Sequence, residues 1–175
     1  MSEIASTLDV TWSSAPDVHE PSEGRLLGAY AEVGDGTDVM VLTAPEADAP
    51  GGPGVRYRLA YANTIAADGD PFATPFVFLV RVYPADRAGA DEIRDWLHGE
   101  HFDRQPSTPG LVWGLGYEAV DGPPHFYNLW GIDDPDVPAS EQYLSIRDTE
   151  WFRRIGPAFG AAQTERAVYR RVDQG

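Results

Sequence analysis

The chain has 175 residues, 42% of them hydrophobic, and its 28 acidic and 13 basic residues give a formal net charge of −15. This length and apolar content indicate one ordinary soluble domain, or two small halves that share a core, and exclude bulk disorder. The negative charge would repel phosphate backbones, so nucleic acid is not expected as a partner. Cysteine and lysine are absent, which excludes disulfides, thiolate metal sites, cysteine nucleophiles and lysine Schiff bases.

Residues 1–24 are polar and lack the basic and apolar regions of a secretory signal, so we expect a surface arm. Residues 25–70 contain apolar runs broken by a Pro- and Gly-rich loop at 45–54, and we expect a β-rich segment. The longest apolar run, Phe76 to Val80, is far shorter than the roughly 20 residues of a membrane span. We therefore expect a cytoplasmic protein that does not contact membranes.

The clearest elements lie in residues 75–172, which we expect to form one domain. Residues 76–83 are a continuous apolar run of strand length, typical of a strand covered on both faces. Residues 90–102 predict a helix. Residues 111–120 and 125–130 predict the two strands of a hairpin, because a Gly- and Pro-containing turn separates them.

A second helix is expected over residues 139–155, where Leu144, Trp151 and Ile155 have helical spacing, and a last strand at 164–172. The resulting order β-α-β-β-α-β predicts a ferredoxin-like unit, an α+β fold with two helices on one face of an antiparallel sheet. The other face of this sheet also carries aromatic residues, so it must be covered by something else.

The first half contains traces of the second. Placing Gly28 on Gly114 also aligns Glu32 with Glu118. The same offset of 86 residues aligns one further Asp with an Asp and one further Gly with a Gly. Either a degenerate repeat or chance explains four matches in such short segments. In a true repeat, the first half keeps a hairpin and a final strand and has a loop in place of the second helix.

Residues 96–102 contain the most informative polar side chains. At 100° per residue, Glu100 falls on the apolar face of the helix and His101 lies on the flank of that face. This pair could act in acid/base chemistry at the edge of a pocket, where partial burial shifts both pKa values. Alternatively, Gly99 frays the helix, Glu100 is solvated, and His101 only caps or packs.

His98 and His101 are three residues apart, which is one spacing found in metal sites, and His125 is near in sequence. On this helix the two side chains diverge, and no third ligand stands at a recognisable spacing. We therefore expect no metal site.

From about residue 76 to 172, the chain resembles the dimeric α+β barrel superfamily and its EthD-like members. The resemblance rests on the first strand, the helix ending in 96–102, the Pro109-Gly110 step into the next strand, and the acidic-aromatic segment 148–152. It implies that two ferredoxin-like sheets pack face to face and close a barrel, from two chains or from two repeats. We expect a homodimer, because the first half offers only three candidate strands.

The resemblance also implies a pocket between helices and sheet for flat, apolar molecules. Members of the superfamily include aromatic polyketide cyclases, cofactor-free quinone-forming monooxygenases, lactone isomerases and haem-dependent enzymes. His101 matches the recurrent histidine of the family and Glu100 the acid before it, so we expect these two and Arg81, which interrupts an apolar strand, to be catalytic. The expected substrate-binding residues are Trp96, Trp113, Tyr117, His125, Tyr127 and Asn128.

We therefore predict a cofactor-independent acid/base enzyme, of cyclase or isomerase type, for a small hydrophobic aromatic or polyketide-like molecule. His101 would move a proton, and Glu100 would orient or tune His101. Arg81, Tyr127 or Asn128 would stabilise a developing enolate or phenolate. The alternatives are a cofactor-free monooxygenase in the same pocket and a non-catalytic small-molecule-binding protein. Haem is a less favoured alternative to the absence of a cofactor.

Overall fold

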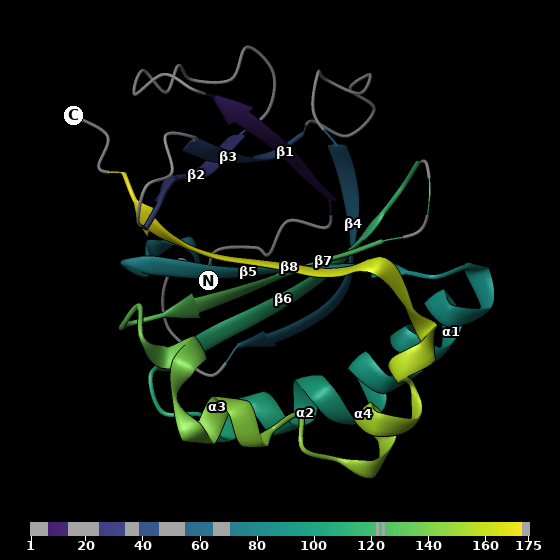
Figure 1. Ribbon diagram of the computed structural model, residues 1–175. Helices are drawn as coiled ribbons and strands as arrows, with labels where there is room; N and C mark the ends of the chain where they lie inside the picture. Colours follow the sequence, from purple (N-terminus) through teal and green to yellow (C-terminus); the bar gives the residue numbers. More distant parts are fainter. Residues whose placement is uncertain are drawn as a thin grey trace.

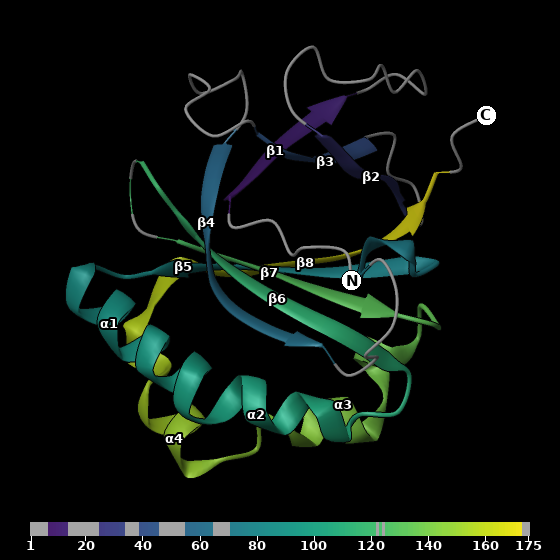
Figure 2. The same ribbon diagram turned by 180° about the vertical axis from the view of Figure 1, so that it is seen from behind.

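In a computed structural model, the residues described are 7–13, 25–33, 39–45, 55–64, 71–121, 123 and 125–172. They form a closed, antiparallel barrel with the strand order β1-β3-β2-β8-β5-β7-β6-β4, and helices cover one outer face of it (Figures 1 and 2). The strands are β1 (Thr7–Ser13), β2 (Arg25–Glu32), β3 (Val39–Ala44), β4 (Val55–Thr64), β5 (Phe76–Pro84), β6 (Leu111–Ala119), β7 (Phe126–Ile132) and β8 (Phe159–Arg171).

The second half is the predicted ferredoxin-like unit, in which β8, β5, β7 and β6 are neighbours in that order. The first predicted helix is longer than expected, because three helical segments follow one another without a break. The predicted helix at 139–155 is instead two short helices, since Thr149 is extended and caps a new one. The helices are α1 (Arg87–Trp96), a π-helix (Leu97–His101), α2 (Phe102–Arg104), α3 (Glu141–Ser145) and α4 (Glu150–Arg154), with 3₁₀ turns at Pro71–Ala73, Gln105–Ser107, Val137–Ala139 and Gly156–Ala158.

The first half repeats this strand order without helices among its described residues. Its four strands lie in the order β4-β1-β3-β2, so that in both halves the fourth, first, third and second strands are neighbours. Gly28 pairs with Leu42, whereas Gly114 pairs with Trp130, so the offset grows from 86 to 88 residues across the hairpin. The topology therefore agrees with a degenerate repeat.

The prediction of a polar arm at residues 1–24 is wrong for residues 7–13, which form β1 between β3 and β4. The strand is amphipathic: Leu8 and Val10 are fully buried, while Asp9 and Thr11, which alternate with them, are partly exposed. This alternation is the strand signal that the surrounding polar sequence obscured. The rest of the predicted arm, and most of the predicted loop at 45–54, lie outside the described residues.

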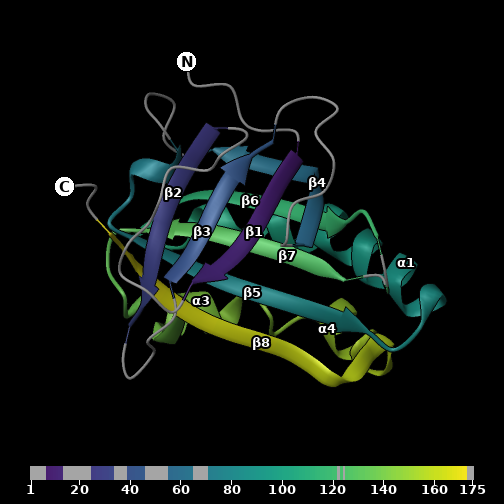
Figure 3. The ribbon, with the colours of Figure 1, turned by 90° about the horizontal axis from the view of Figure 1, so that it is seen from above.

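The barrel closes within one chain. Seen from above, β1, β2 and β3 lie across the sheet of the second half (Figure 3). The first half thus covers the sheet face that the helices leave free, and a second chain is not needed to close the barrel. The argument given for a homodimer therefore fails, although association of two copies stays a prediction. Both halves fill the interior with apolar side chains: Leu8, Val10, Leu27, Tyr30, Met40, Leu42, Tyr57, Phe72, Val77, Leu79, Trp113, Leu115, Tyr117, Tyr127, Leu129 and Tyr169.

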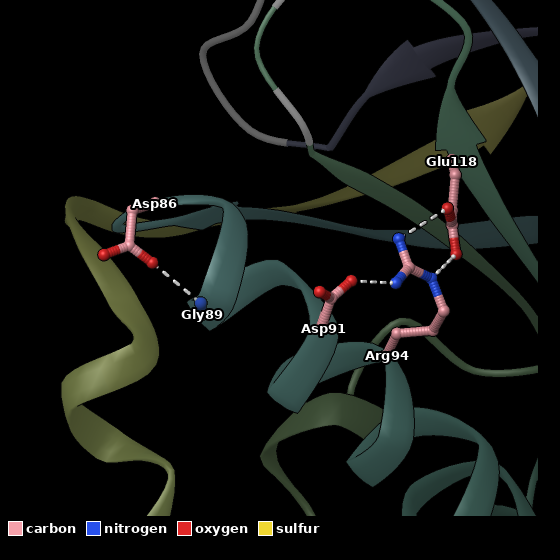
Figure 4. A network of polar contacts seen from close by, with 5 residues as sticks. All are labelled: Asp86, Gly89, Asp91, Arg94 and Glu118. Carbon is pink, nitrogen blue, oxygen red and sulfur yellow. Dashed lines mark hydrogen bonds and ion pairs between the residues drawn. The ribbon is translucent and has the colours of Figure 1, made fainter.

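Polar contacts fix α1 against the sheet (Figure 4). Asp86 caps the helix by accepting a hydrogen bond from the Gly89 amide at 2.8 Å. The Arg94 guanidinium donates to both carboxylate oxygens of Glu118 on β6, at 2.7 and 3.1 Å, and to Asp91 at 2.6 Å. Among the described residues, no helix has the length and apolar character needed to cross a membrane.

A second hydrophobic core lies between this sheet and the helices. Glycines on β6 allow aromatic rings of this core to lie directly against the strand. A Cβ atom at Gly116 would lie 2.6 Å from the Phe102 ring, and one at Gly114 would lie 2.2 Å from the Trp130 ring. Real Cβ atoms do not approach so closely, so glycine at these positions lets both rings rest on the strand. The helices therefore lie close to the sheet around Asn128 and His101.

Candidate functional site

The sheet divides the predicted site residues into two groups. Alternate residues of a strand point to opposite faces, so Tyr127 lies in the barrel core and Asn128 faces the helices. The residues on the helix side are Trp96, Glu100, His101 and Asn128, and those on the barrel side are Arg81, Trp113, Tyr117, His125 and Tyr127. The nine residues therefore cannot line a single site.

A cavity lies between the sheet and the helices. Its volume is about 20 Å³, on a scale where one water needs about 10–15 Å³. Three polar atoms of its lining are buried without a hydrogen-bond partner: His101 Nδ1, Asn128 Oδ1 and Arg147 Nε. Buried polar atoms are nearly always paired in proteins, so their gathering here makes this cavity the candidate site. Its lining consists of Val80, Val82, Trp96, Leu97, His101, Asn128, Tyr143, Arg147, Phe152, Phe159, Thr164 and Arg166.

The π-helix Leu97–His101 delivers His101 to this cavity, and π-turns occur frequently at functional sites. The alternative in which Gly99 frays the helix is wrong, because the chain stays helical through Arg104. Gly99 instead makes room for α4: a Cβ atom there would lie 2.8 Å from the Trp151 ring.

Glu100 links this helix to α4. Its carboxylate accepts hydrogen bonds from Trp96 Nε1 at 3.0 Å and from Thr149 Oγ1 at 2.8 Å. The Thr149 side chain also caps α4 by accepting from the Phe152 amide. Glu100 does not belong to the cavity lining, so its contacts give it a positioning role, and a direct catalytic role stays a prediction.

His101 is buried and neutral. Its ring lies 4.3 Å from the Trp96 ring, and Gln105 Nε2 lies 3.0 Å from His101 Nε2. Burial, and then the positive charges of Arg147, Arg104 and Arg166, lower the pKa of His101 to about 3. An amide nitrogen can only donate, so His101 Nε2 accepts this bond and the ring proton resides on Nδ1. With the Gln105 amide nitrogen as the donor, His101 holds its Nδ1–H toward the cavity without a hydrogen-bond partner.

Asn128 lies in the middle of a row that crosses the sheet. Arg166, Val80, Asn128 and Gly116 are successive neighbours on β8, β5, β7 and β6. All four positions face the helices, because Val80, Asn128 and Arg166 line the cavity and Gly116 lies beneath Phe102. The row thus holds a partner-free amide oxygen at its centre and a cation at one end.

Arg81 lies at an end of the barrel and is engaged in several contacts. Its guanidinium lies 4.8 Å from the Trp12 ring centroid, pairs with Glu165 at 2.9 Å and donates to Tyr83 at 3.0 Å. Glu165 thus supplies a carboxylate partner for this arginine, and a catalytic role of Arg81 stays a prediction. The sheet separates Arg81 from His101.

The other barrel residues have partners inside the barrel. Trp113 Nε1 donates to Thr74 at 3.2 Å, the Tyr127 hydroxyl donates to Met40 Sδ at 2.9 Å, and burial raises the pKa of Tyr117. His125 Nε2 lies 2.9 Å from the Tyr57 hydroxyl, whose pKa burial raises to about 12. Trp113, Tyr117 and Tyr127 belong to the barrel core, whereas His125 is partly exposed just before β7. None of the four belongs to the cavity lining, so their role in substrate binding stays a prediction.

The two histidines of the helix do not share a ligand. His98 is exposed beside Tyr61, with ring centroids 5.8 Å apart, whereas His101 is buried. In the part of the chain that the structure describes, three or more His, Asp or Glu side chains do not gather in a way that could hold a metal ion.

Sequence reasoning missed four polar residues of the cavity lining: Tyr143, Arg147, Thr164 and Arg166. Arg166 shares a strand face with Thr164, and both lie opposite buried valines of β5. The alternation of side chains along β8 could therefore have indicated that these two residues face the helices. Arg147 lies between two short helices and had no such signal.

Neither a protein-family model nor a curated protein matches the chain. Solved structures match over almost its whole length. A regulator of staphylococcal pathogenesis has a TM-score of 0.63 at 8% identity, with 95% of this chain and 99% of that chain covered. An anthrone oxidase-like protein has a TM-score of 0.62 at 12% identity, covering 95% and 90%. A ferredoxin-fold protein from Listeria monocytogenes, related to antibiotic biosynthesis monooxygenases, has a TM-score of 0.58 at 12% identity, covering 96% and 95%.

The chain has the ferredoxin-like α+β barrel fold of this group. Identities of 8–12% establish the fold and leave the activity open. The narrower EthD-like assignment stays a prediction.

Proposed function

We propose that the chain is a cofactor-independent enzyme that oxidises a small, flat, phenolic or enolisable aromatic molecule with O₂ in the cavity beside His101. The observation that carries this proposal is the gathering of three partner-free polar atoms in a cavity whose lining is otherwise largely aliphatic and aromatic. Similar structures named as antibiotic biosynthesis monooxygenase-related and anthrone oxidase-like support it.

The polar atoms of the cavity suit an electron-rich anion. His101 Nδ1–H would donate to an enolate or phenolate oxygen, Asn128 Oδ1 would accept from a substrate hydroxyl, and Arg147 adds a positive charge to the same cavity. Because these groups are already desolvated and held by the fold, they stabilise the anion more than water does. The anion is the form of the substrate that gives up electrons to O₂, and its proton leaves to solvent.

Anthrone illustrates a balanced reaction. Both C–H bonds of its methylene carbon break, one oxygen atom of O₂ becomes the new carbonyl oxygen, and the other leaves as water. The substrate supplies all four electrons and O₂ accepts them, so no further reductant is required. Within this reaction the cavity binds the ring system between Trp96 and Phe152 and stabilises the deprotonated oxygen.

Substrate entry requires side chains to move, since the cavity of about 20 Å³ is far smaller than an aromatic ring system. The short helix α4 is the cover most easily displaced, because none of its residues is fully buried. Trp151 and Phe152 of α4 are only partly buried, and we expect them to move outward on binding.

The cavity does not fit haem. His101 is its one histidine, and the Nε2 atom of that ring already has Gln105 as its partner at 3.0 Å. The His101 ring is also packed on Trp96. A porphyrin would have to displace most of the helical layer, so we derive no step through haem.

The test is O₂ consumption and quinone formation with anthrone as substrate. We expect turnover by the wild-type protein and a loss of about 100-fold in His101→Ala, from the removal of one donor to the developing anion. Tyr127→Phe, which removes a hydroxyl on the other face of the sheet, is the matched control and should retain full activity. Equal rates for wild type, His101→Ala and buffer would refute the proposal.

The same assay separates the alternatives. Acid/base isomerisation or cyclisation, the activity first expected from the sequence, would continue without O₂. A non-catalytic role would show as binding without turnover, and it is favoured by the similar structure that is named as a regulator.

A further inference from the structure

Two arginines at one end of the cavity lack an acidic partner. Arg147, which follows α3, and Arg166 on β8 both line the cavity, and neither forms an ion pair with any described residue. Arg147 is half-buried, and its Nε atom has no hydrogen-bond partner. Partial burial, and then the charge of Arg147, lower the pKa of Arg166. The two guanidinium groups therefore repel each other across the end of the cavity.

This arrangement is unusual in a chain with a net charge of −15. Arg147 is partly buried without an acidic partner, whereas the partly buried Arg56 pairs with Asp9 at 2.8 Å and Arg81 with Glu165 at 2.9 Å. Arg166 is more exposed than Arg147. His101 experiences the same imbalance, since the charges that act on its pKa are all arginines. The cavity is thus positive inside an acidic protein, and this lowers the free energy of a bound anion.

We propose that Arg147 and Arg166 bind a carboxylate group of the substrate, which makes the substrate class aromatic carboxylic acids. This inference rests on the function proposed above, since it uses the same cavity. A guanidinium group matches the planar geometry of a carboxylate and holds it with paired hydrogen bonds. Trp96, Phe152 and Phe159 in the same lining would contact the rings.

The sheet sets the expected size of the acid. Arg166 and Asn128 lie on either side of Val80 in one row, so their Cα atoms are two strand spacings, or about 10 Å, apart. A molecule with a carboxylate at Arg166 and an oxygen function at Asn128 spans this distance with about two fused rings. The carboxylate would then bind at one end while the reacting oxygen lies beside His101 and Asn128.

The experiment compares two probes of the same shape, 2-naphthoate and its neutral methyl ester, by isothermal titration and by quenching of tryptophan fluorescence. We expect the wild-type protein to bind the carboxylate at least 10-fold more tightly. Arg147→Gln and Arg166→Gln should each weaken naphthoate binding about 10-fold and leave the ester unchanged. Arg154→Gln, which removes an exposed arginine of α4 outside the lining, is the control and should bind both probes like the wild type.

Thermal unfolding without ligand adds a result that a structural role would not give. Because the two arginines repel each other, Arg166→Gln should unfold at the same temperature as the wild type or slightly above it. Equal binding of both probes by the wild type, or weaker binding of both by the arginine variants, would overturn the carboxylate assignment and leave the proposed oxidation standing. If neither probe binds, the carboxylate assignment fails, and the O₂-consumption assay with anthrone alone decides the proposed oxidation.

Discussion

The two halves of the barrel share a strand order and differ in what lies outside it. In each half the fourth, first, third and second strands are neighbours, and both halves fill one common interior. Only the second half carries helices among the described residues, and only there do partner-free polar atoms gather around a cavity. The comparison indicates that the barrel supplies stability, while the helices inserted after β5 and β7 create the site.

The largest expected effect tests the shared interior. Leu42 of the first half and Leu129 of the second are both fully buried, so replacing either with alanine should lower the free energy of unfolding by about 2–5 kcal/mol. Urea titration should give one cooperative transition for both variants. Leu144→Ala, at a position 48% exposed, is the control and should stay within about 0.5 kcal/mol of the wild type. Two transitions in Leu42→Ala would mean that the halves fold separately.

The second prediction tests whether the candidate site lies on the helix face of the sheet and not on its barrel face. Asn128→Leu keeps the volume of the side chain and removes the oxygen that faces the cavity, so turnover of an anthrone that carries a ring hydroxyl should fall about 100-fold, equivalent to about 2.7 kcal/mol. Tyr117→Phe removes a polar atom on the barrel face and should change the rate less than 2-fold. Comparable losses in both variants would contradict the assignment of the site to the helix face.

A third prediction concerns the pH dependence of stability on the helix side. The pKa of His101 falls from about 6.5 in the unfolded chain to about 3 in the folded protein, so the unfolded state binds more protons between these values. The contribution of His101 to the free energy of unfolding is complete above pH 6.5. It is lost as the pH falls toward 3, by at most about 1.4 kcal/mol per pH unit. His101→Gln should therefore lose less stability than the wild type between pH 7 and 5. Parallel curves in urea denaturation would refute a buried, neutral His101.

The smallest expected change is in the free energy of unfolding, when one ion pair from each half of the barrel is removed. Arg94 and Glu118 join α1 to β6, and Arg56 and Asp9 join β4 to β1. Glu118→Gln and Asp9→Asn should each lower the free energy of unfolding by about 0.5–1 kcal/mol, as expected for partly exposed pairs. Only Glu118→Gln should also weaken substrate binding, because it loosens the helix that carries His101. A weaker binding in Asp9→Asn would show that the first half contributes to the site.

Much of the second half could be predicted from the sequence, because its apolar runs have clear periods of two and 3.6 residues. Closure of the barrel within one chain could not, since it depends on the pairing of β2 with β8, over only three residue pairs between distant segments. Local patterns carry no information on such pairing. The sequence predicted only three strands in the first half. With β1, which was not predicted, the first half has four strands, like the second half.

The site was predicted in part for a similar reason. The sequence places Tyr127 and Asn128 on opposite faces of one strand but does not say which face the helices cover. Residues from both faces were therefore combined into one predicted site. The histidine of the cavity was found through its motif, whereas Arg147 and Arg166 come together only in three dimensions.

The most direct test of the central claim is a two-dimensional ¹H–¹⁵N NMR titration of the tryptophan indole signals with anthrone or 2-naphthoate. Trp96 lines the cavity on the helix face, whereas Trp113 lies in the barrel interior. The indole signal of Trp96 should shift strongly on binding while that of Trp113 stays in place. A shift of Trp113 with an unchanged Trp96 signal would place the ligand inside the barrel and contradict the account.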